Sequence, residues 1–113
     1  NVVSLRMPLA LYSSALLDEI PDVEIAAQAV SKGDGIKGRV HYVTGVNGEQ
    51  RAGRYGWKAH VATLEEMVAE AFANEIGITN PLTHSTLNAP PKDNGDLVRA
   101  VAAYLRELRV PAR

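Results

Sequence analysis

The residues best suited to chemistry lie in one short stretch, from Gly53 to Ala59. Trp57 is the only tryptophan of the chain, and Tyr55 and the two cations Arg54 and Lys58 stand around it. One interpretation is an indole packed at a hairpin end with a cation stacked on its ring, and composition alone favours it. The alternative is an oxidisable aromatic side chain placed between redox centres.

Carboxylates and histidines supply the other titratable groups. Four glutamates crowd one expected helix: Glu65, Glu66, Glu70 and Glu75. One interpretation is a solvated helix face whose negative charges near the N-terminus compensate the helix dipole. The other is that Glu66 or Glu70 acts as an acid–base group facing a cofactor. The three histidines, His41, His60 and His84, form no metal-ligand motif. A lone histidine is usually a hydrogen-bonded or surface residue, and His60, near Trp57, is the leading candidate for a ligand.

Composition describes a globular domain and excludes several classes of protein. The chain has 113 residues, 46% of them hydrophobic, which fits one domain or part of one. A net charge of -1 with scattered Lys and Arg indicates no nucleic-acid partner. No apolar run approaches the roughly 18 residues that cross a bilayer, so no membrane span is expected. The absence of cysteine excludes covalent attachment of haem c within this chain.

Periodicity and capping signals predict a mainly α fold of four helices and one β-hairpin. The helices are expected from about Pro8 to Glu19, from the cap Asp22 to the turn at Gly33 and Gly35, from the capping box Thr63–Glu66 to Gly77, and from the cap Asp93 to Pro111. Their buried stripes are expected at Leu9, Tyr12, Leu16, Leu17 and Ile20; at Val23, Ala26, Ala27 and Val30; at Leu64, Met67, Val68, Ala71 and Phe72; and at Leu97, Val101, Tyr104, Leu105 and Leu108.

The hairpin is predicted from alternation before a turn signal. Val40, Tyr42 and Thr44 alternate ahead of Asn47-Gly48, the strongest short signal for a tight hairpin turn. A two-residue loop there pairs Val46 with Glu49. Counted outward, this register places His41 opposite Arg54 and Val40 opposite Tyr55.

Several short motifs, taken in order, resemble a known family. They are Leu16-Leu17-Asp18-Glu19-Ile20-Pro21-Asp22, Gly38-Arg39-Val40, Gly53-Arg54-Tyr55-Gly56-Trp57-Lys58-Ala59, Ala71-Phe72, Gly77-Ile78-Thr79-Asn80-Pro81-Leu82, and the ending from Tyr104 to Arg113. The ordered set resembles the di-haem c-type cytochrome oxidoreductases, a family also described as thiol oxidoreductases or di-haem peroxidases. The resemblance covers nearly the whole chain, although each motif alone is weak.

This resemblance implies that residues 1–113 are one segment of a larger, periplasmic protein. Family members carry two c-type haems on C-x-x-C-H motifs, and this chain resembles the part between the attachment sites. Its first partner is then the haem-bearing remainder of the parent chain, where the fold is cytochrome-c-like. The parent is expected to move electrons between its haems and a peroxide or a redox partner protein.

The resemblance also implies roles for individual residues. Trp57 is expected to relay electrons, Lys58 and Arg54 to pair with haem propionates, Tyr55 and His60 to contact haem, and Glu66 or Glu70 to manage protons. The isolated chain is expected to be inactive and, with apolar surface uncovered, to form a homodimer. The competing interpretation is a non-catalytic helical interaction module whose Tyr55–Trp57 surface binds another protein.

Overall fold

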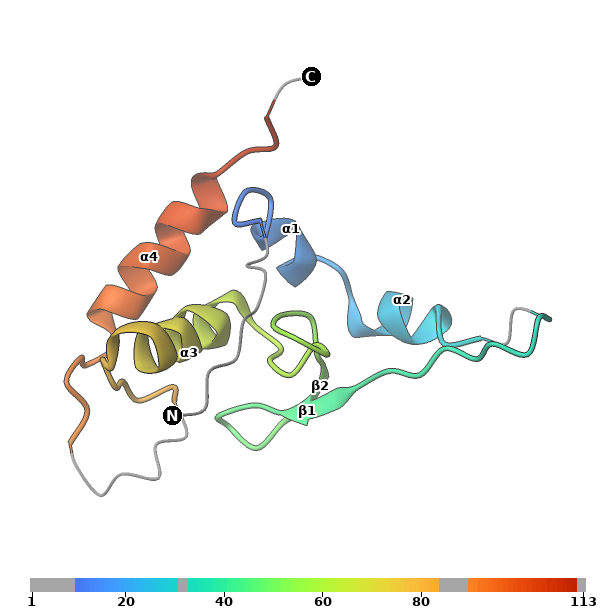
Figure 1. Ribbon diagram of the computed structural model, residues 1–113, viewed down its shortest axis with the longest axis horizontal. Helices are drawn as coiled ribbons and strands as arrows, with labels where there is room; N and C mark the ends of the chain where they lie inside the picture. The colour runs from blue at the N-terminus through green and yellow to red at the C-terminus, as the bar shows by residue number, and fades with distance from the viewer. Residues whose placement is uncertain (1–9, 31–32, 84–89, 112–113) are drawn as a thin grey trace, which may run out of the picture.

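The computed structural model describes residues 10–30, 33–83 and 90–111, and it confirms a mainly helical fold with one antiparallel hairpin (Figure 1). The elements are α1 (Ala15–Asp18), α2 (Asp22–Ala27), β1 (Tyr42–Thr44), β2 (Gln50–Ala52), α3 (Leu64–Ile76) and α4 (Asp96–Glu107). No helix in these ranges is long and apolar enough to cross a membrane.

Helix α3 begins and ends where the sequence predicts. The Thr63 hydroxyl accepts a hydrogen bond from the Glu66 N–H at 3.2 Å, and the Glu66 carboxylate accepts one from the Thr63 N–H at 3.1 Å. This reciprocal capping box satisfies two of the donors that a helix N-terminus leaves unpaired. Gly77 ends the helix in the left-handed conformation at φ 68°, which a residue without Cβ adopts without strain.

The hydrophobic core lies where α3 and α4 pack against each other (Figure 1), and Tyr55 and Val61 belong to it. The buried core residues are Tyr55, Val61, Leu64, Val68, Ala69, Val98, Ala102 and Leu105. The stripe predicted for α4 is partly wrong, because Leu97 and Tyr104 are 44% and 62% exposed. Two apolar rows lie next to each other on this helix, and the row that contains the small Ala102 faces α3.

Helix α4 begins at Asp96, three residues later than the expected cap. Gly95, at φ 98°, precedes it. The Asp93 carboxylate nevertheless accepts hydrogen bonds from the N–H groups of Gly95 and Leu97, at 3.0 and 3.2 Å. Asp93 therefore still satisfies backbone donors at the start of the helix.

The prediction of a long first helix is wrong over the described residues. Ser13 has φ 59°, a left-handed value that no helix interior tolerates, and α1 spans only four residues. Tertiary bonds explain the break: the Ser13 N–H donates to the Leu108 carbonyl at 3.0 Å, and the Ser14 carbonyl accepts from Tyr55. The expected apolar stripe is consequently exposed at Tyr12 and Leu16. Pro8 and Leu9 lie outside the described residues.

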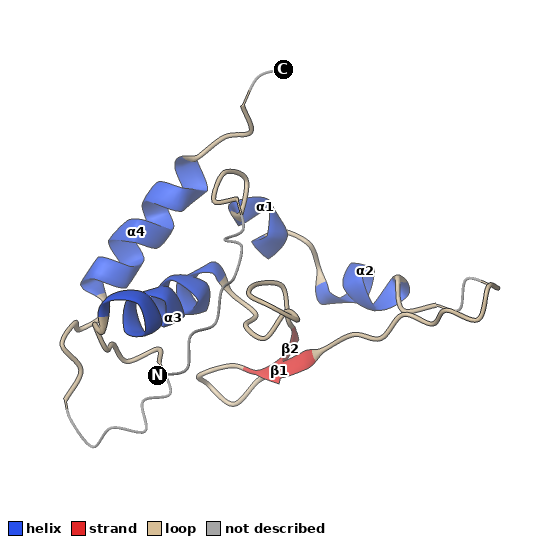
Figure 2. Cartoon of the chain, viewed as in Figure 1, coloured by secondary structure: helices blue, strands red, loops and turns tan. Residues whose placement is uncertain are grey.

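Helix α2 is shorter than predicted and buries nothing. It ends at Ala27, and Val23 and Val30 of the expected stripe are 72% and 54% exposed. Gly33 and Gly35 adopt the positive φ values of a turn, as expected. The chain between α2 and β1 extends away from the α3–α4 core (Figure 2).

The hairpin forms, but its predicted register is wrong by one residue. The pairs are Tyr42 with Ala52, Val43 with Arg51, and Thr44 with Gln50. The loop has three residues rather than two, because Gly48, at φ 79°, forms a single left-handed bulge and its N–H closes a turn on the Gly45 carbonyl at 2.9 Å. His41 therefore lies opposite Gly53, whose N–H donates to the His41 carbonyl at 2.8 Å, and not opposite Arg54.

Candidate functional site

The candidate site is the loop that carries Trp57 between the hairpin and α3. An antiparallel bridge between Tyr55 and Val61 closes the loop at its base. Three of the residues inside it have positive φ: Gly56 at 74°, Lys58 at 61° and Ala59 at 51°. Two of these have a Cβ, for which the conformation is unfavourable. Contacts outside the loop must hold it in place.

Two histidine side chains hold neighbouring carbonyls of the loop: His41 reaches it from the hairpin, and His60 lies within it and is itself bonded to α3. His60 Nδ1 lies 2.8 Å from the Trp57 oxygen, and His41 Nδ1 lies 2.8 Å from the Lys58 oxygen. Because a carbonyl can only accept, each of these ring nitrogens carries a proton. Both histidines therefore act on the backbone of the Trp57 loop. Sequence reasoning missed His41 because its predicted register was wrong.

Glu70 on α3 holds the second nitrogen of His60. The distance from His60 Nε2 to Glu70 Oε2 is 2.6 Å, so a proton lies between them. With both ring nitrogens engaged, His60 has no lone pair directed at a metal ion or a haem iron in this conformation. The expectation that His60 contacts haem remains a prediction, while its observed contacts position the loop.

Close packing explains the glycines on either side of Tyr55. A Cβ on Gly53 would lie 1.8 Å from the Ala59 carbonyl oxygen, and a Cβ on Gly56 would lie 2.1 Å from the His60 ring. Neither space admits a methyl group without moving the loop. The two glycines, two histidines and Glu70 together fix the backbone that presents Trp57, which is 58% exposed.

Arg54 points into the fold. Its guanidinium donates to the carbonyls of Leu17, Ala52 and Ile20 at 2.6 to 2.9 Å and to the Asp22 carboxylate at 2.5 Å, and its side chain is only 2% exposed. These bonds join the α1–α2 connection to the end of the hairpin. The ion pair between Arg54 and a haem propionate stays a prediction. The acceptors that the Arg54 guanidinium contacts are protein groups.

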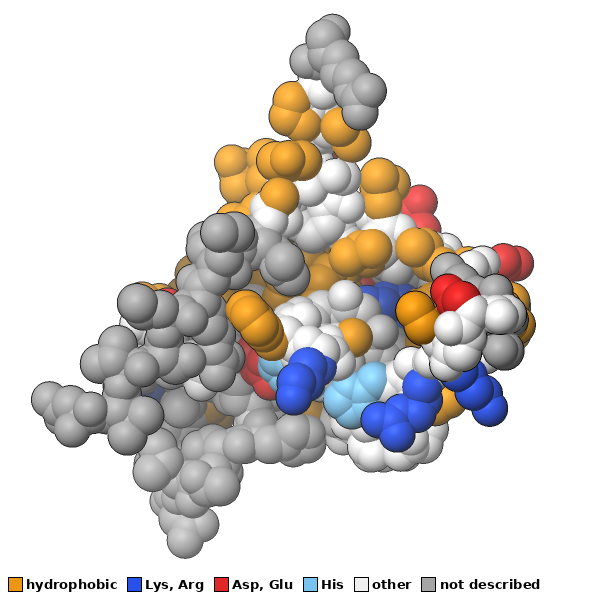
Figure 3. All heavy atoms as spheres, turned by 45° about the vertical axis from the view of Figure 1, so that its right-hand side comes forward, with side chains coloured by type: hydrophobic (Ala, Val, Ile, Leu, Met, Phe, Trp, Pro, Cys, Tyr) orange, Lys and Arg blue, Asp and Glu red, His pale blue; other side chains and the backbone are white. Residues whose placement is uncertain are grey.

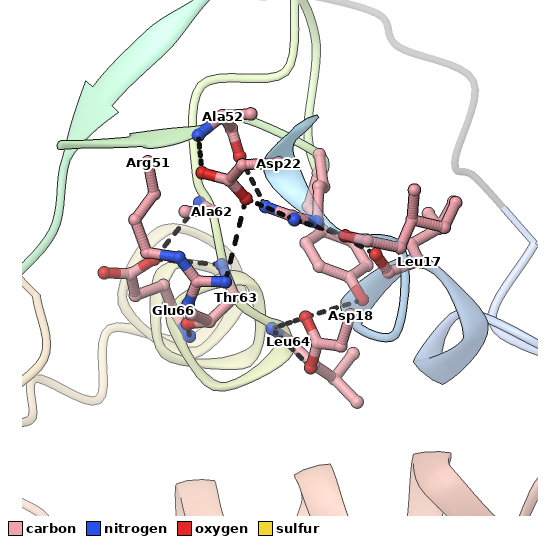
Figure 4. Close-up of polar contacts among 12 residues, drawn as sticks. Leu17, Asp18, Asp22, Arg51, Ala52, Ala62, Thr63, Leu64 and Glu66 are labelled. Atoms are coloured by element: carbon pink, nitrogen blue, oxygen red, sulfur yellow. Dashed lines mark hydrogen bonds and ion pairs between the residues drawn. The ribbon is translucent and has the colours of Figure 1, made fainter. Parts of the chain in front are cut away.

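Asp22 is a residue whose role the sequence did not reveal. Figure 4 shows its carboxylate beside Ala52, whose N–H it accepts at 2.8 Å. This N–H and the Arg54 guanidinium hold the pKa of Asp22 below its ordinary value. Its expected role as the cap of α2 is wrong, because Pro21 occupies the cap position and Asp22 bonds to residues 30 and 32 positions away.

Tyr55 is buried beneath the same loop. Its hydroxyl lies 2.7 Å from the Ser14 carbonyl and 3.1 Å from the Asp18 carboxylate. The Asp18 carboxylate also accepts the Leu64 N–H at the start of α3 (Figure 4). Burial, and then the negative charge of Asp18, raise the pKa of Tyr55 above its usual range, so the phenol stays protonated.

The seven predicted site residues thus fall into two groups. Trp57, Lys58, His60 and Glu70 lie together at the exposed end of the loop, whereas Arg54, Tyr55 and Glu66 make contacts within the fold. The Glu66 carboxylate accepts the N–H groups of Ala62 and Thr63, both at 3.1 Å, which is its capping role. Its role in managing protons is untested.

Comparisons with protein-family models, with curated proteins and with solved structures gave no match. In the part of the chain that the structure describes, no three acidic or histidine side chains gather to hold a metal ion. A haem fits these residues only as a neighbour, because the chain has no cysteine to attach it and His60 is engaged on both nitrogens. What the site offers to such a neighbour is an exposed indole and the adjacent Lys58.

Proposed function

We propose that this chain is a haem-facing segment of a larger di-haem c-type oxidoreductase that transfers electrons. The observation that carries the proposal is Trp57, 58% exposed on a loop with two unfavourable backbone conformations, whose carbonyls are held by His41 from outside the loop and by His60 from within it. Its support from sequence is the ordered set of motifs around this tryptophan. Export to the periplasm, and a peroxide or a redox protein as the other reactant, belong to the same proposal.

The energetics of the loop favour a functional tryptophan over a packed one. An unfavourable φ costs about 1 kcal/mol or more at a residue with a Cβ, and it persists only where other contacts compensate. Here those contacts keep a large apolar ring in water, although Tyr55, two residues earlier, is fully buried. A flat apolar partner such as a porphyrin would cover this ring.

The balance of buried and exposed apolar residues also supports a longer protein. Ten apolar residues form the buried set, whereas fifteen large apolar side chains of the described residues are exposed. The radius of gyration is 15.9 Å, against about 13 Å for a compact domain of this length. Contacts with the remainder of a parent chain would cover this surface.

The residues of this chain would position the indole and relay electrons through it. Haem, when bound, supplies the one-electron chemistry. Trp57 would lie on the path between the two haems. Lys58 would pair with a propionate, and His60 with Glu70 would keep the indole in place. Arg54 and Tyr55 would act from beneath, by fixing the base of the loop.

The test is the gene together with its full-length product. C-x-x-C-H motifs are expected on both sides of this segment. In the full-length protein, Trp57→Phe is expected to slow electron transfer between the haems at least tenfold, measured by stopped-flow absorbance, while the haem spectra stay unchanged. Tyr104→Phe, at an exposed position on α4, is the control. An unchanged rate rules out the relay, and flanks without haem motifs rule out the family.

One observation favours the alternative, a non-catalytic interaction module. Around Trp57, His60 and Glu70 are bonded to each other, and Arg54 and Tyr55 are buried, so an exposed aromatic ring remains without an obvious acid–base partner. Tryptophan is also enriched at the energetic centres of protein interfaces. The gene sequence on either side of this segment separates the two proposals: C-x-x-C-H motifs favour the oxidoreductase, and their absence favours the interaction module.

A further inference from the structure

A second exposed feature lies on the chain segment that leads into β1. Along residues 37–41 exposure alternates as in a strand: Lys37, Arg39 and His41 are exposed, and Gly38 and Val40 are partly buried. Alternate residues of an extended chain share one face. Two cations and a histidine therefore form a row, here called the basic row, with neighbouring members about 7 Å apart along the chain.

The cations of the basic row have no acidic partner among the described residues. Across the described residues, Arg51, Arg54, Arg99 and Arg106 each lie within 4.0 Å of a carboxylate. Lys37 and Arg39 have no such contact in those residues. Asp34, the nearest acid in sequence, accepts the Ile36 N–H at 2.9 Å instead. Figure 3 shows one face of the molecule on which blue cationic side chains gather beside a pale-blue histidine.

The backbone of the basic row is held at both ends. A Cβ on Gly38 would lie 2.9 Å from the Gln28 carbonyl oxygen and 3.0 Å from the Ala29 Cα, so this glycine lies directly against the end of α2. At the other end, the His41 carbonyl accepts the Gly53 N–H at 2.8 Å, and the His41 ring bonds to the Lys58 carbonyl. Such pre-organisation lowers the entropy lost on binding.

We propose that the basic row is a docking site for an extended acidic segment of a partner protein. An extended peptide with carboxylates at alternate positions has the same repeat as the basic row, so two successive acids can meet Lys37 and Arg39. Protein rather than nucleic acid is favoured because the row is short and the whole chain has a net charge of -1. The proposal uses neither Trp57 nor a haem, and it is independent of the proposed function.

The experiment measures binding of the 113-residue chain to a fluorescent peptide of alternating Glu and Thr, by anisotropy. Binding is expected to weaken as salt rises. Lys37→Glu with Arg39→Glu is expected to weaken it at least tenfold. The matched control is Lys92→Glu with Arg109→Glu, which changes net charge equally at exposed sites elsewhere and is expected to stay within about threefold.

Three results would overturn the proposal. An unchanged affinity in the Lys37–Arg39 variant would show that the row is not the site. An equal loss of affinity in the Lys37–Arg39 variant and in the Lys92–Arg109 control would mean that net charge alone governs binding. Tighter binding of single-stranded DNA of equal charge would identify a nucleic acid as the partner. Circular dichroism of both variants checks that the fold is retained, which is expected because all four side chains are exposed.

Discussion

At the scale of single residues, the polar groups around Trp57 are mostly structural. Tyr55 and Arg54 each donate from a largely buried side chain to backbone carbonyls of the α1 region, at Ser14, Leu17 and Ile20. His41 and His60 hold two carbonyls of the exposed Trp57 loop in the same way, through side-chain hydrogen bonds. The exposed indole is thus supported by side chains whose own function is to position the backbone.

Removal of the Tyr55 hydroxyl measures one of these contacts. Tyr55→Phe leaves the Ser14 carbonyl without its buried donor, so the free energy of unfolding should fall by about 1–2 kcal/mol. Urea titration followed by circular dichroism gives the value. Tyr104→Phe is the control, because that ring is exposed and its loss should cost under about 0.5 kcal/mol. Equal effects in the two variants would contradict the buried bond.

The Asp22 carboxylate makes stability depend on pH in a definite direction. Its pKa is lower in the folded chain than in the unfolded one, so its stabilisation is complete above the unfolded value, about 3.9, and is lost as the pH falls through the folded value. Asp22→Asn should lower the free energy of unfolding by about 1–2 kcal/mol at pH 7, a modest figure because the carboxylate is 34% exposed.

The difference between the wild type and Asp22→Asn should shrink as the pH is lowered below about 4, measured by urea titration at each pH. Asp34→Asn is the matched control, since Asp34 is exposed and, among the described residues, its carboxylate accepts the Ile36 N–H alone. If the difference in the free energy of unfolding between wild type and Asp22→Asn stayed constant on acidification, the ionised carboxylate would not be what stabilises the contact between α2 and the hairpin.

At the scale of elements, the Trp57 loop depends on space as much as on hydrogen bonds. A methyl group on Gly53 would meet the Ala59 carbonyl at 1.8 Å, and backbone cannot turn aside as a flexible side chain can. Gly53→Ala should therefore lower the free energy of unfolding by about 2–3 kcal/mol and shift the fluorescence of Trp57.

The control for Gly53→Ala is Gly45→Ala in the same hairpin. There the nearest atoms to a new Cβ are side-chain atoms of Glu49 and Glu66, at 3.4 and 3.5 Å, so a cost under about 1 kcal/mol is expected. If Gly53→Ala were as mild as Gly45→Ala, the close approach of Ala59 to the hairpin would be disproved.

The elements that the sequence predicted well are those set by neighbours in the chain. The capping box of α3 joins Thr63 to Glu66, three residues apart, and Gly77 ends the helix by its own conformation. The hairpin register depended on whether Gly48 formed a bulge, which the Asn47-Gly48 signal alone does not decide. At α1, the break at Ser13 depends on a bond to Leu108, far along the chain, and no local pattern predicts it.

In the candidate site, too, local features could be predicted from the sequence and long-range contacts could not. The Gly53–Ala59 stretch was identified from residue types alone, and Trp57 and Lys58 are exposed there. That Arg54 would turn inward could not be predicted, because three of its four acceptors lie in the α1–α2 region more than 30 residues earlier. The contact between His60 and Glu70 joins a loop to a helix ten residues later, and a sequence pattern gives no distance for it.

At the scale of the whole molecule, packing is uneven. The core is formed by α3, α4 and the Tyr55–Val61 bridge, whereas α2 has no buried residue and contacts β2 through Asp22. The described chain between α2 and β1 extends from this body (Figure 2). A molecule built this way should open locally at α2 with a far smaller free energy than at α3.

Amide hydrogen exchange followed by mass spectrometry checks this unevenness in the wild type and in Leu64→Ala. Leu64 is fully buried in the hydrophobic core, so its truncation should lower the free energy of unfolding by about 2–5 kcal/mol. In the wild type, protection should be highest in α3 and α4 and lowest in α2. In the variant, protection of α3 and α4 should fall together while that of α2 changes little, because α2 already exchanges by local opening. Two results would contradict this: equal protection of all four helices in the wild type, or an equal loss of protection in α2 in the variant. Either would mean that α2 is as firmly joined to the core as α4 is.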